Sequence, residues 1–190
     1  GGLGRLRHAS TQMRQLNLCD TQVSGDLQDL RGGTKLTQLD LHGTKVSGNL
    51  KFLQNATQLK ELNLYGLKIA GNLMELQHAK ELIKLSLNGP KISGHLEALQ
   101  HARNLQQLVL CGMEVIGDLE ALQHAPQLRM LDLHGTQVSG DLQVLQGAAK
   151  LIQLNLHGTK VSGNLQSLPL EATELRELDL SSTSVLGDLQ

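Results

Sequence analysis

Side chains that bind metals recur at a fixed interval in the second half of the sequence. Cys111, His134 and His157 are 23 residues apart, and Asp132 lies two residues before His134. Thiolate, imidazole and carboxylate groups are ligands that suit zinc. If the equal spacing places them on neighbouring parallel strands, however, they form a row with steps of about 4.8 Å, which flanks an ion instead of surrounding it. We therefore expect neither a metal site nor a cofactor.

The same row argues against a nucleophilic cysteine. A catalytic thiolate needs a base within hydrogen-bond reach and a third group that orients this base. Side chains on an open sheet are not shielded from water, and the sequence brings no acid, base and nucleophile together in an enclosed site. The sequence therefore predicts a protein that is not an enzyme.

The 23-residue interval extends along the chain. The segment LTQLDLHGTKVSGNLKFLQNATQ (36–58) is followed by LKELNLYGLKIAGNLMELQHAKE (59–81), and repeats start near residues 13, 36, 59, 82, 105, 128, 151 and 175. The alternation x-L-x-L predicts a short strand with one buried face. The later L-x-x-L predicts a helical or 3₁₀ turn on the far side of each coil. Between them, the G-T-x-V-S-G stretch is expected to turn the chain.

These residues resemble the leucine-rich-repeat family over essentially the whole chain. The L-x-x-L-x-L core recurs, with Met13 in place of one leucine, and G-(D/N)-L resembles part of the plant-type repeat in a Thr-rich variant. The resemblance implies an α/β solenoid: a right-handed superhelix with a concave parallel β-sheet and short helical or 3₁₀ turns on its convex side. It also implies a function in binding other macromolecules.

The whole chain, 1–190, is predicted to be a single array of about eight repeats. Gly1 and Gln190 both fall in mid-repeat, and the terminal caps of the family are absent. Because solenoids need polar ends, we expect the array to be part of a longer chain or complex.

The variable positions that flank the strand leucines are expected to cover the concave face. Most are short polar groups, as on a solvated sheet. The exceptions, Tyr65, Val109, Cys111 and Met130, gather near the middle of the array, and an aromatic with apolar neighbours inside a polar rim is typical of a binding patch. The predicted contact residues are Tyr65, Lys84, Ser86, Val109, Cys111, Met130, Asp132 and His134.

The three middle repeats, 59–127, depart from the pattern. The family resemblance implies an Asn at the ninth position that hydrogen-bonds backbone between coils; here the position is mostly Thr, whose hydroxyl we expect to take over that bond. Leu67, Pro90 and Met113 cannot do so. Either these side chains pack as apolar substitutes, or the three repeats are reshaped around a partner.

Two polar columns follow the strands. Lys45, Lys68 and Lys91 stack on three consecutive coils and Lys160 returns later. The neighbouring Asp/Asn column is Asp26, Asn49, Asn72, His95, Asp118, Asp141, Asn164 and Asp188. We interpret the lysines as a solubilising flank whose repulsion salt screens; the alternative is a site for an acidic or phosphorylated partner.

Composition excludes several other classes. The formal net charge is −1 and the only aromatics are one Tyr and one Phe, so we expect no nucleic-acid partner. No apolar run approaches about 18 residues, so we expect no direct membrane insertion. Cys19 and Cys111 are four repeats apart and cannot pair, which slightly favours an intracellular location. The sequon Asn55-Ala56-Thr57 points the other way, so the location stays open.

The sequence therefore predicts a non-catalytic module for protein–protein recognition or scaffolding. Its partner is a protein or peptide that binds the concave face through shape and polar complementarity. The alternative is a structural subunit or spacer of a large assembly, which contacts its partners through convex or lateral surfaces.

Overall fold

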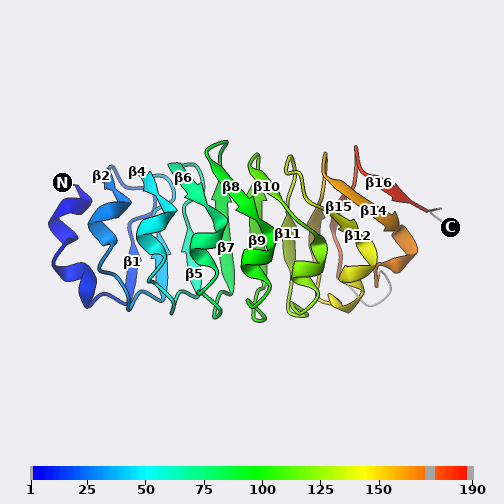
Figure 1. Ribbon diagram of the computed structural model, residues 1–190, viewed down its shortest axis with the longest axis horizontal. Helices are drawn as coiled ribbons and strands as arrows, with labels where there is room; N and C mark the ends of the chain where they lie inside the picture. The colour runs from blue at the N-terminus through cyan, green and yellow to red at the C-terminus, as the bar shows by residue number, and fades with distance from the viewer. Residues whose placement is uncertain (1, 170–173, 188–190) are drawn as a thin grey trace.

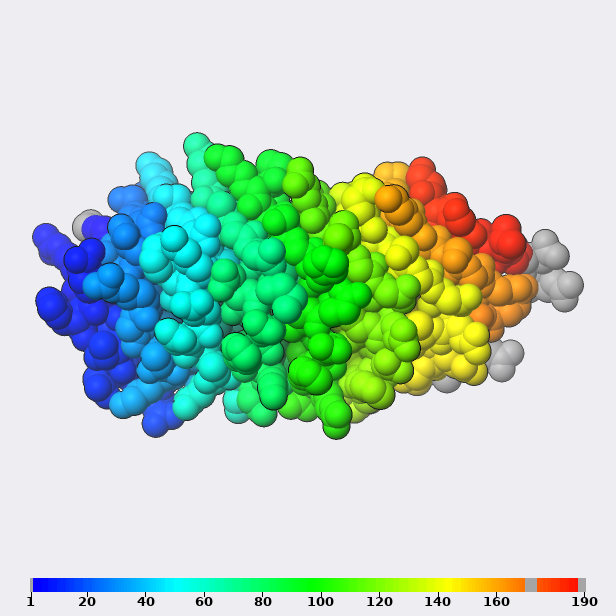
Figure 2. All heavy atoms as spheres, viewed as in Figure 1, coloured from blue at the N-terminus to red at the C-terminus, as the bar shows by residue number. Residues whose placement is uncertain are grey.

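Eight short parallel strands form one sheet in chain order. The computed structural model describes residues 2–169 and 174–187. The strands are β1 (Gln15–Asn17), β3 (Gln38–Asp40), β5 (Glu61–Asn63), β7 (Lys84–Asn88), β9 (Gln107–Cys111), β11 (Met130–Asp132), β13 (Gln153–Asn155) and β15 (Glu177–Asp179). Equivalent residues of successive coils pair, so Gln15 lies beside Gln38, and Gln38 beside Glu61. The molecule is elongated, and the coils follow one another from end to end (Figures 1 and 2).

The L-x-x-L segments form 3₁₀ turns stacked along the molecule on the side away from this sheet (Figure 1). They are η1 (Leu3–Leu6), η2 (Ala9–Thr11), η3 (Leu27–Leu30), η4 (Leu50–Leu53), η5 (Leu73–Leu76), η6 (Leu96–Leu99), η7 (Leu119–Leu122), η8 (Leu142–Gly147) and η9 (Leu165–Ser167). The predicted solenoid of parallel strands and short turns is confirmed.

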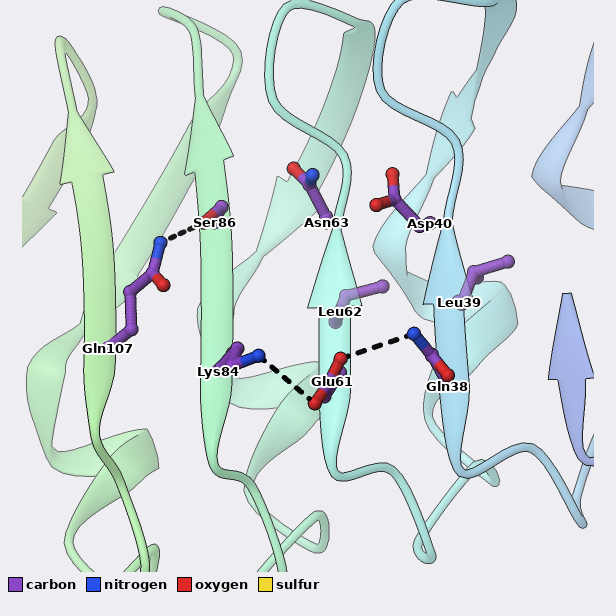
Figure 3. A pocket seen from close by; sticks show the side chains of 9 residues that line it. All are labelled: Gln38, Leu39, Asp40, Glu61, Leu62, Asn63, Lys84, Ser86 and Gln107. Atoms are coloured by element: carbon purple, nitrogen blue, oxygen red, sulfur yellow. Dashed lines mark hydrogen bonds and ion pairs between the residues drawn. The ribbon is translucent and has the colours of Figure 1, made fainter. Parts of the chain in front are cut away.

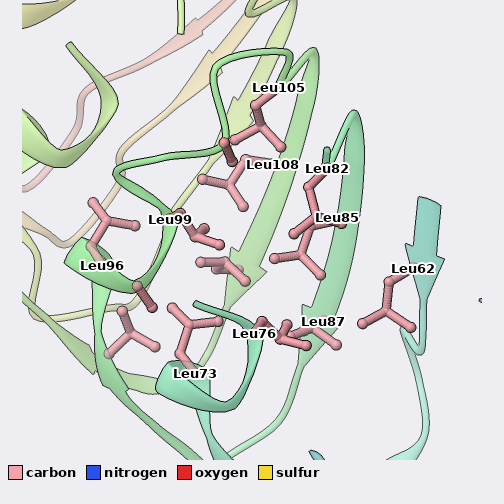
Figure 4. Close-up of a cluster of buried hydrophobic side chains, with 14 of the residues drawn as sticks. Leu62, Leu73, Leu76, Leu82, Leu85, Leu87, Leu96, Leu99, Leu105 and Leu108 are labelled. Atoms are coloured by element: carbon pink, nitrogen blue, oxygen red, sulfur yellow. The ribbon is translucent and has the colours of Figure 1, made fainter. Parts of the chain in front are cut away.

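The core lies between the strands and the 3₁₀ turns. Leu39, Leu62, Leu85 and Leu108, from four consecutive strands, are at most 1% exposed. Figure 4 shows leucines from strands and turns of neighbouring coils converging on the same interior. Each buried leucine therefore packs against leucines of the neighbouring coil as well as against those of its own coil.

The stretch that was expected only to turn the chain forms further parallel sheets. Five strands pair as β2 (Ser24–Asp26), β4 (Lys45–Asn49), β6 (Lys68–Asn72), β8 (Ile92–His95) and β10 (Glu114–Ile116), and three more as β12 (Ser139–Asp141), β14 (Lys160–Asn164) and β16 (Ser184–Leu186). The prediction missed the K-V-S alternation, in which Val46 is buried between an exposed and a half-buried residue. A β-branched residue in such an alternation favours a strand.

Glycine is required where these strands pass the preceding coil. Gly48 has φ +132°, and a Cβ atom there would lie 2.8 Å from the backbone nitrogen of Leu27. A side chain would therefore collide with the neighbouring coil, in a backbone region that only glycine enters readily. This close approach explains why the repeats carry a glycine at this position.

The Asp/Asn column caps the 3₁₀ turns, a role that the sequence analysis did not assign to it. The side chain of each of Asp26, Asn49, Asn72, Asp118, Asp141 and Asn164 accepts a hydrogen bond from the backbone N–H two residues later. These bonds satisfy donors that the start of a turn leaves free. Asp188 lies outside the described residues, as do Gly1 and Gln190.

His95 makes no such cap, and Glu97 takes over the position of the missing oxygen. In other coils the cap oxygen lies against the glycine of the next coil, as Asn72 Oδ1 does at Gly94. At Gly117 the nearest group is the carboxylate of Glu97. Its Oε1 accepts from the backbone N–H of Asp118 at 3.2 Å, and its Oε2 lies 3.6 Å from His95 Nδ1.

The lysine column is exposed next to the second set of strands. Lys45, Lys68 and Lys160 each begin a strand, and Lys91 directly precedes β8. No ion pair joins these four ammonium groups to any residue that the structure describes. Both interpretations of the column, a solubilising flank and an anion-binding flank, are compatible with this exposure.

The threonine hydroxyls bond within their own coil, so the predicted bonds between coils are wrong. Thr44 Oγ1 donates to the carbonyl of Leu41 at 2.6 Å, and Thr136 and Thr159 bond in the same way to Leu133 and Leu156, each at 2.7 Å. A threonine side chain is shorter than asparagine, and its hydroxyl meets the carbonyl three residues earlier. The same-coil bond satisfies that carbonyl.

The apolar ninth positions are mostly buried. Leu67 and Met113 are 7% and 3% exposed, whereas Pro90 is exposed. Leu67 and Met113 therefore pack as apolar substitutes.

Replacing Glu97 by Ala tests its role as a substitute cap. We expect the free energy of unfolding to fall by about 1 kcal/mol, because the Asp118 amide loses its acceptor. Urea denaturation measures the change. Glu120, at the same place in the next coil, is the control, and its replacement by Ala should cost less than about 0.5 kcal/mol. Adding His95→Asn to Glu97→Ala should offset part of the loss, because an Asn side chain there would accept from the backbone N–H two residues later, as in other coils. Equal losses at Glu97 and Glu120 would contradict the role.

Candidate functional site

The outward side chains of the eight-stranded sheet form three columns, which we call the sheet face. The first column is Gln15, Gln38, Glu61, Lys84, Gln107, Met130, Gln153 and Glu177. The second is Asn17, Asp40, Asn63, Ser86, Val109, Asp132, Asn155 and Asp179, and the third is Cys19, His42, Tyr65, Asn88, Cys111, His134, His157 and Ser181. All eight predicted contact residues belong to these columns.

In most coils the second column ends the strand. The side chains of Asp40, Asn63 and Asp132 accept from the backbone N–H two residues later, at 3.1 to 3.3 Å, which turns the chain out of the sheet. In the two coils that follow Asn63, this position is occupied by Ser86 and Val109, and neither side chain makes this bond. Their strands, β7 and β9, run for five residues instead of three. The middle of the array is therefore locally reshaped.

Tyr65 is held in place although it is exposed. Its backbone N–H donates to Asn63 Oδ1 at 3.3 Å, and the following N–H, of Gly66, donates to Asn88 Oδ1 at 2.7 Å. The Cys111 thiol donates to the Tyr65 hydroxyl, with 3.8 Å between Sγ and Oη. Tyr65 belongs to the coil of β5 and Cys111 to that of β9, so the tyrosine side chain reaches past the intervening coil.

Cys111 is buried instead of forming surface. Its side chain is 5% exposed, whereas Tyr65 is 38% exposed. Burial raises the pKa of the Cys111 thiol, and the Tyr65 hydroxyl partly offsets this effect. The contact with Cys111 in turn raises the pKa of the Tyr65 phenol. Cys111 was expected among the exposed contacts; the structure gives it the role of supporting Tyr65.

A polar row crosses the sheet face beside Tyr65. Glu61 accepts from Gln38 Nε2 at 3.2 Å and pairs with Lys84 Nζ at 3.3 Å, as Figure 3 shows. Gln107 Nε2 lies 3.4 Å from Ser86 Oγ. A hollow of about 150 Å³ lies between this row and the row of Asp40, Asn63 and Ser86. The only ammonium of the sheet face, Lys84, is therefore already paired.

A second hollow, of about 310 Å³, adjoins Tyr65 and shares three residues with the first. It is lined by His42, Asn63, Tyr65, Ser86, Gln107 and Val109. Tyr65 and Val109 supply its apolar surface, and the other four supply hydrogen-bonding groups. Sequence analysis predicted Lys84 and Ser86 among the polar lining residues but missed His42, Asn63 and Gln107, although the 23-residue register already placed these beside the predicted ones.

Four of the eight predicted contact residues line one or both of the two hollows. Tyr65, Ser86 and Val109 line the larger hollow, and Lys84 and Ser86 line the smaller one. Met130 is half-buried and pairs with Gln107 in the sheet. Asp132 lies beside Val109 in register, and its Oδ1 is 2.7 Å from His134 Nδ1.

Within residues 2–169 and 174–187, no three His, Cys, Asp or Glu side chains come together as a metal-binding group. Cys19 and Cys111 are both free thiols. None of the described helices has the length and apolar character needed to cross a bilayer.

Comparison with known proteins identifies the fold. No family model and no curated protein matches the sequence. Among solved structures, it is similar to a TDR receptor (22% identity, TM-score 0.80, 98% of this chain and 33% of that one). It is also similar to the Arabidopsis receptor kinase HAESA, solved with the peptide hormone IDA and the co-receptor SERK1 (25%, 0.66, 91% and 34%). A third is internalin C2 of Listeria monocytogenes (24%, 0.66, 95% and 76%).

The chain has the fold of a leucine-rich-repeat solenoid, as its sequence pattern indicates. Several structural neighbours, HAESA among them, are described as leucine-rich-repeat ectodomains. The chain spans about a third of the length of the two plant receptors named above.

Thiol labelling tests whether the Tyr65 side chain shields the Cys111 thiol from solvent. In the folded protein Cys111 should react with iodoacetamide more slowly than the half-buried Cys19, because burial limits access to its thiol and raises its pKa. Tyr65→Ala should accelerate labelling of Cys111 several-fold and leave Cys19 unchanged, as measured by mass spectrometry of the digested protein. An unchanged rate at Cys111 would contradict the assigned contact.

Proposed function

We propose that the protein is a non-catalytic recognition module that binds a protein or peptide on its sheet face. The observation that carries this proposal is Tyr65, an exposed aromatic held by neighbouring coils at the edge of a hollow. Anchoring residues of protein interfaces are often aromatic and lie next to pockets within a polar rim. A restrained side chain also loses little conformational entropy when a partner binds.

The hydrogen bonding of the sheet backbone supports recognition of a partner through side chains instead of through strand pairing. The inner strands of the sheet bond to neighbours on both sides, so an added peptide cannot pair with them as a further strand. A partner must therefore contact the side-chain columns. HAESA, which has a similar fold, is described in complex with a peptide hormone and a co-receptor, and we propose a partner of this general kind for this chain.

A structural role in a larger assembly is the second candidate. The observation that favours it is the exposed column of Lys45, Lys68 and Lys91, which has no ion pair within the described residues and lies away from the sheet face. A subunit or spacer that uses this lateral surface would not depend on Tyr65.

Affinity capture from a lysate of the source organism with paired variants separates the two functions. Tyr65→Ala combined with Met130→Ala should weaken capture of a specific partner about tenfold or more, because it removes the proposed anchor and a second apolar side chain of the sheet face. Gln54→Ala combined with Gln100→Ala, on the side of the 3₁₀ turns, is the control and should leave capture unchanged. Urea denaturation should show that both variants remain folded.

The opposite pattern would support the structural role. If the Tyr65 and Met130 variant still captures the partner while Lys45→Gln with Lys68→Gln does not, recognition by the sheet face is wrong.

A further inference from the structure

The sheet face has a net negative charge. Its three columns contain five carboxylates, Asp40, Glu61, Asp132, Glu177 and Asp179, and one ammonium, Lys84. Their formal charge is −4, whereas that of the whole chain is −1. Lys84 is paired with Glu61 at 3.3 Å. The sheet face is therefore complementary to a basic partner.

The carboxylates nearest to the larger hollow retain binding capacity. Asp40 Oδ1 accepts from the backbone N–H of His42 at 3.1 Å, and Asp132 Oδ1 is engaged by His134. The second oxygen of each carboxylate has no hydrogen bond within the described part of the chain. Both belong to the column that also contains Ser86 and Val109, so one carboxylate lies on each side of the hollow.

The lining of the hollow suits one kind of basic side chain. The Tyr65 ring offers a π face to a cation, and Val109 offers an apolar wall to a methylene stem. Asn63, Ser86 and Gln107 provide oxygen acceptors at its rim. Arginine combines a planar cation that stacks on aromatic rings, several donors and an apolar stem. Lysine has neither the planar group nor as many donors.

We propose that the hollow beside Tyr65 binds an arginine side chain of the partner, and that the sheet face recognises a basic peptide segment. The guanidinium stacks on the Tyr65 ring and donates to the rim, and Asp40 and Asp132 attract the neighbouring positive charge. This inference rests on the proposed function, because it specifies the partner of the same surface.

A random dodecapeptide library displayed on phage provides the probe. Panned on the wild-type chain, it should enrich peptides with arginine at one fixed position. In a synthetic copy of an enriched peptide, replacing this arginine by citrulline should raise the Kd about tenfold, because the uncharged isostere loses the cation–π and ionic interactions. Added NaCl should also raise the Kd of the arginine peptide.

Variants at Tyr65 separate stacking from apolar contact. Tyr65→Phe keeps the ring and should bind the arginine peptide within about twofold of wild type. Tyr65→Leu keeps an apolar side chain of similar reach and should weaken binding about fivefold. Asp40→Asn should weaken binding about threefold, whereas Glu120→Gln, on the side of the 3₁₀ turns, is the control and should have no effect. Tyr65 is exposed, so these variants should remain folded, and urea denaturation checks this.

The outcomes distinguish failure of the arginine site from failure of the proposed function. Enrichment of acidic or purely apolar peptides that bind wild type but not Tyr65→Ala would overturn the arginine site and leave recognition by the sheet face intact. If the Tyr65→Leu variant binds the arginine peptide as tightly as wild type, the arginine site is also wrong. If no peptide depends on Tyr65, both the arginine site and the proposed function are wrong.

Discussion

Lateral pairing between coils is the constraint on which this structure depends. A single coil of 23 residues has only a short strand and one 3₁₀ turn, and it cannot enclose its own leucines. When equivalent residues of successive coils pair, as Leu39, Leu62 and Leu85 do, the backbone groups of the strands find partners and the leucines close over one another. Stability is therefore shared along the stack, and the spacing of the coils is set by the strand separation of about 4.8 Å.

This pairing also decides which positions can vary. The close approach at Gly48 and the caps made by residues such as Asn72 bring backbone within contact distance of the next coil, so these positions are tightly constrained. His95 shows that a cap can be lost when another group, the carboxylate of Glu97, occupies the vacated position. Outward side chains of the eight-stranded sheet are less constrained in this way, although Asn88 bonds to the backbone of Gly66 in the preceding coil. They are free to carry the chemistry of recognition.

The middle coils use this freedom most. With Ser86 and Val109 in place of Asp or Asn, the strands continue for two more residues, and Asn88 bonds back to the loop that carries Tyr65. A change at one position of the repeat thus alters the shape of the surface and adds a hydrogen bond to the loop that carries its exposed aromatic side chain. Restraint of Tyr65 by Asn63, Asn88 and Cys111 favours binding, since little flexibility is left to lose.

The sequence by itself determined the period, the strand and 3₁₀ positions and the outward columns, because these follow from the spacing of leucines and the alternation of buried and exposed positions. The 23-residue register also places Tyr65, Ser86 and Val109 close together. The second set of strands was missed because its K-V-S pattern is too short to tell from a turn. Only the tertiary structure decided that Cys111 is buried against Tyr65, that the Thr44 hydroxyl bonds within its own coil, and that Glu97 replaces a cap. These outcomes depend on side-chain reach between coils, which a one-dimensional pattern does not contain.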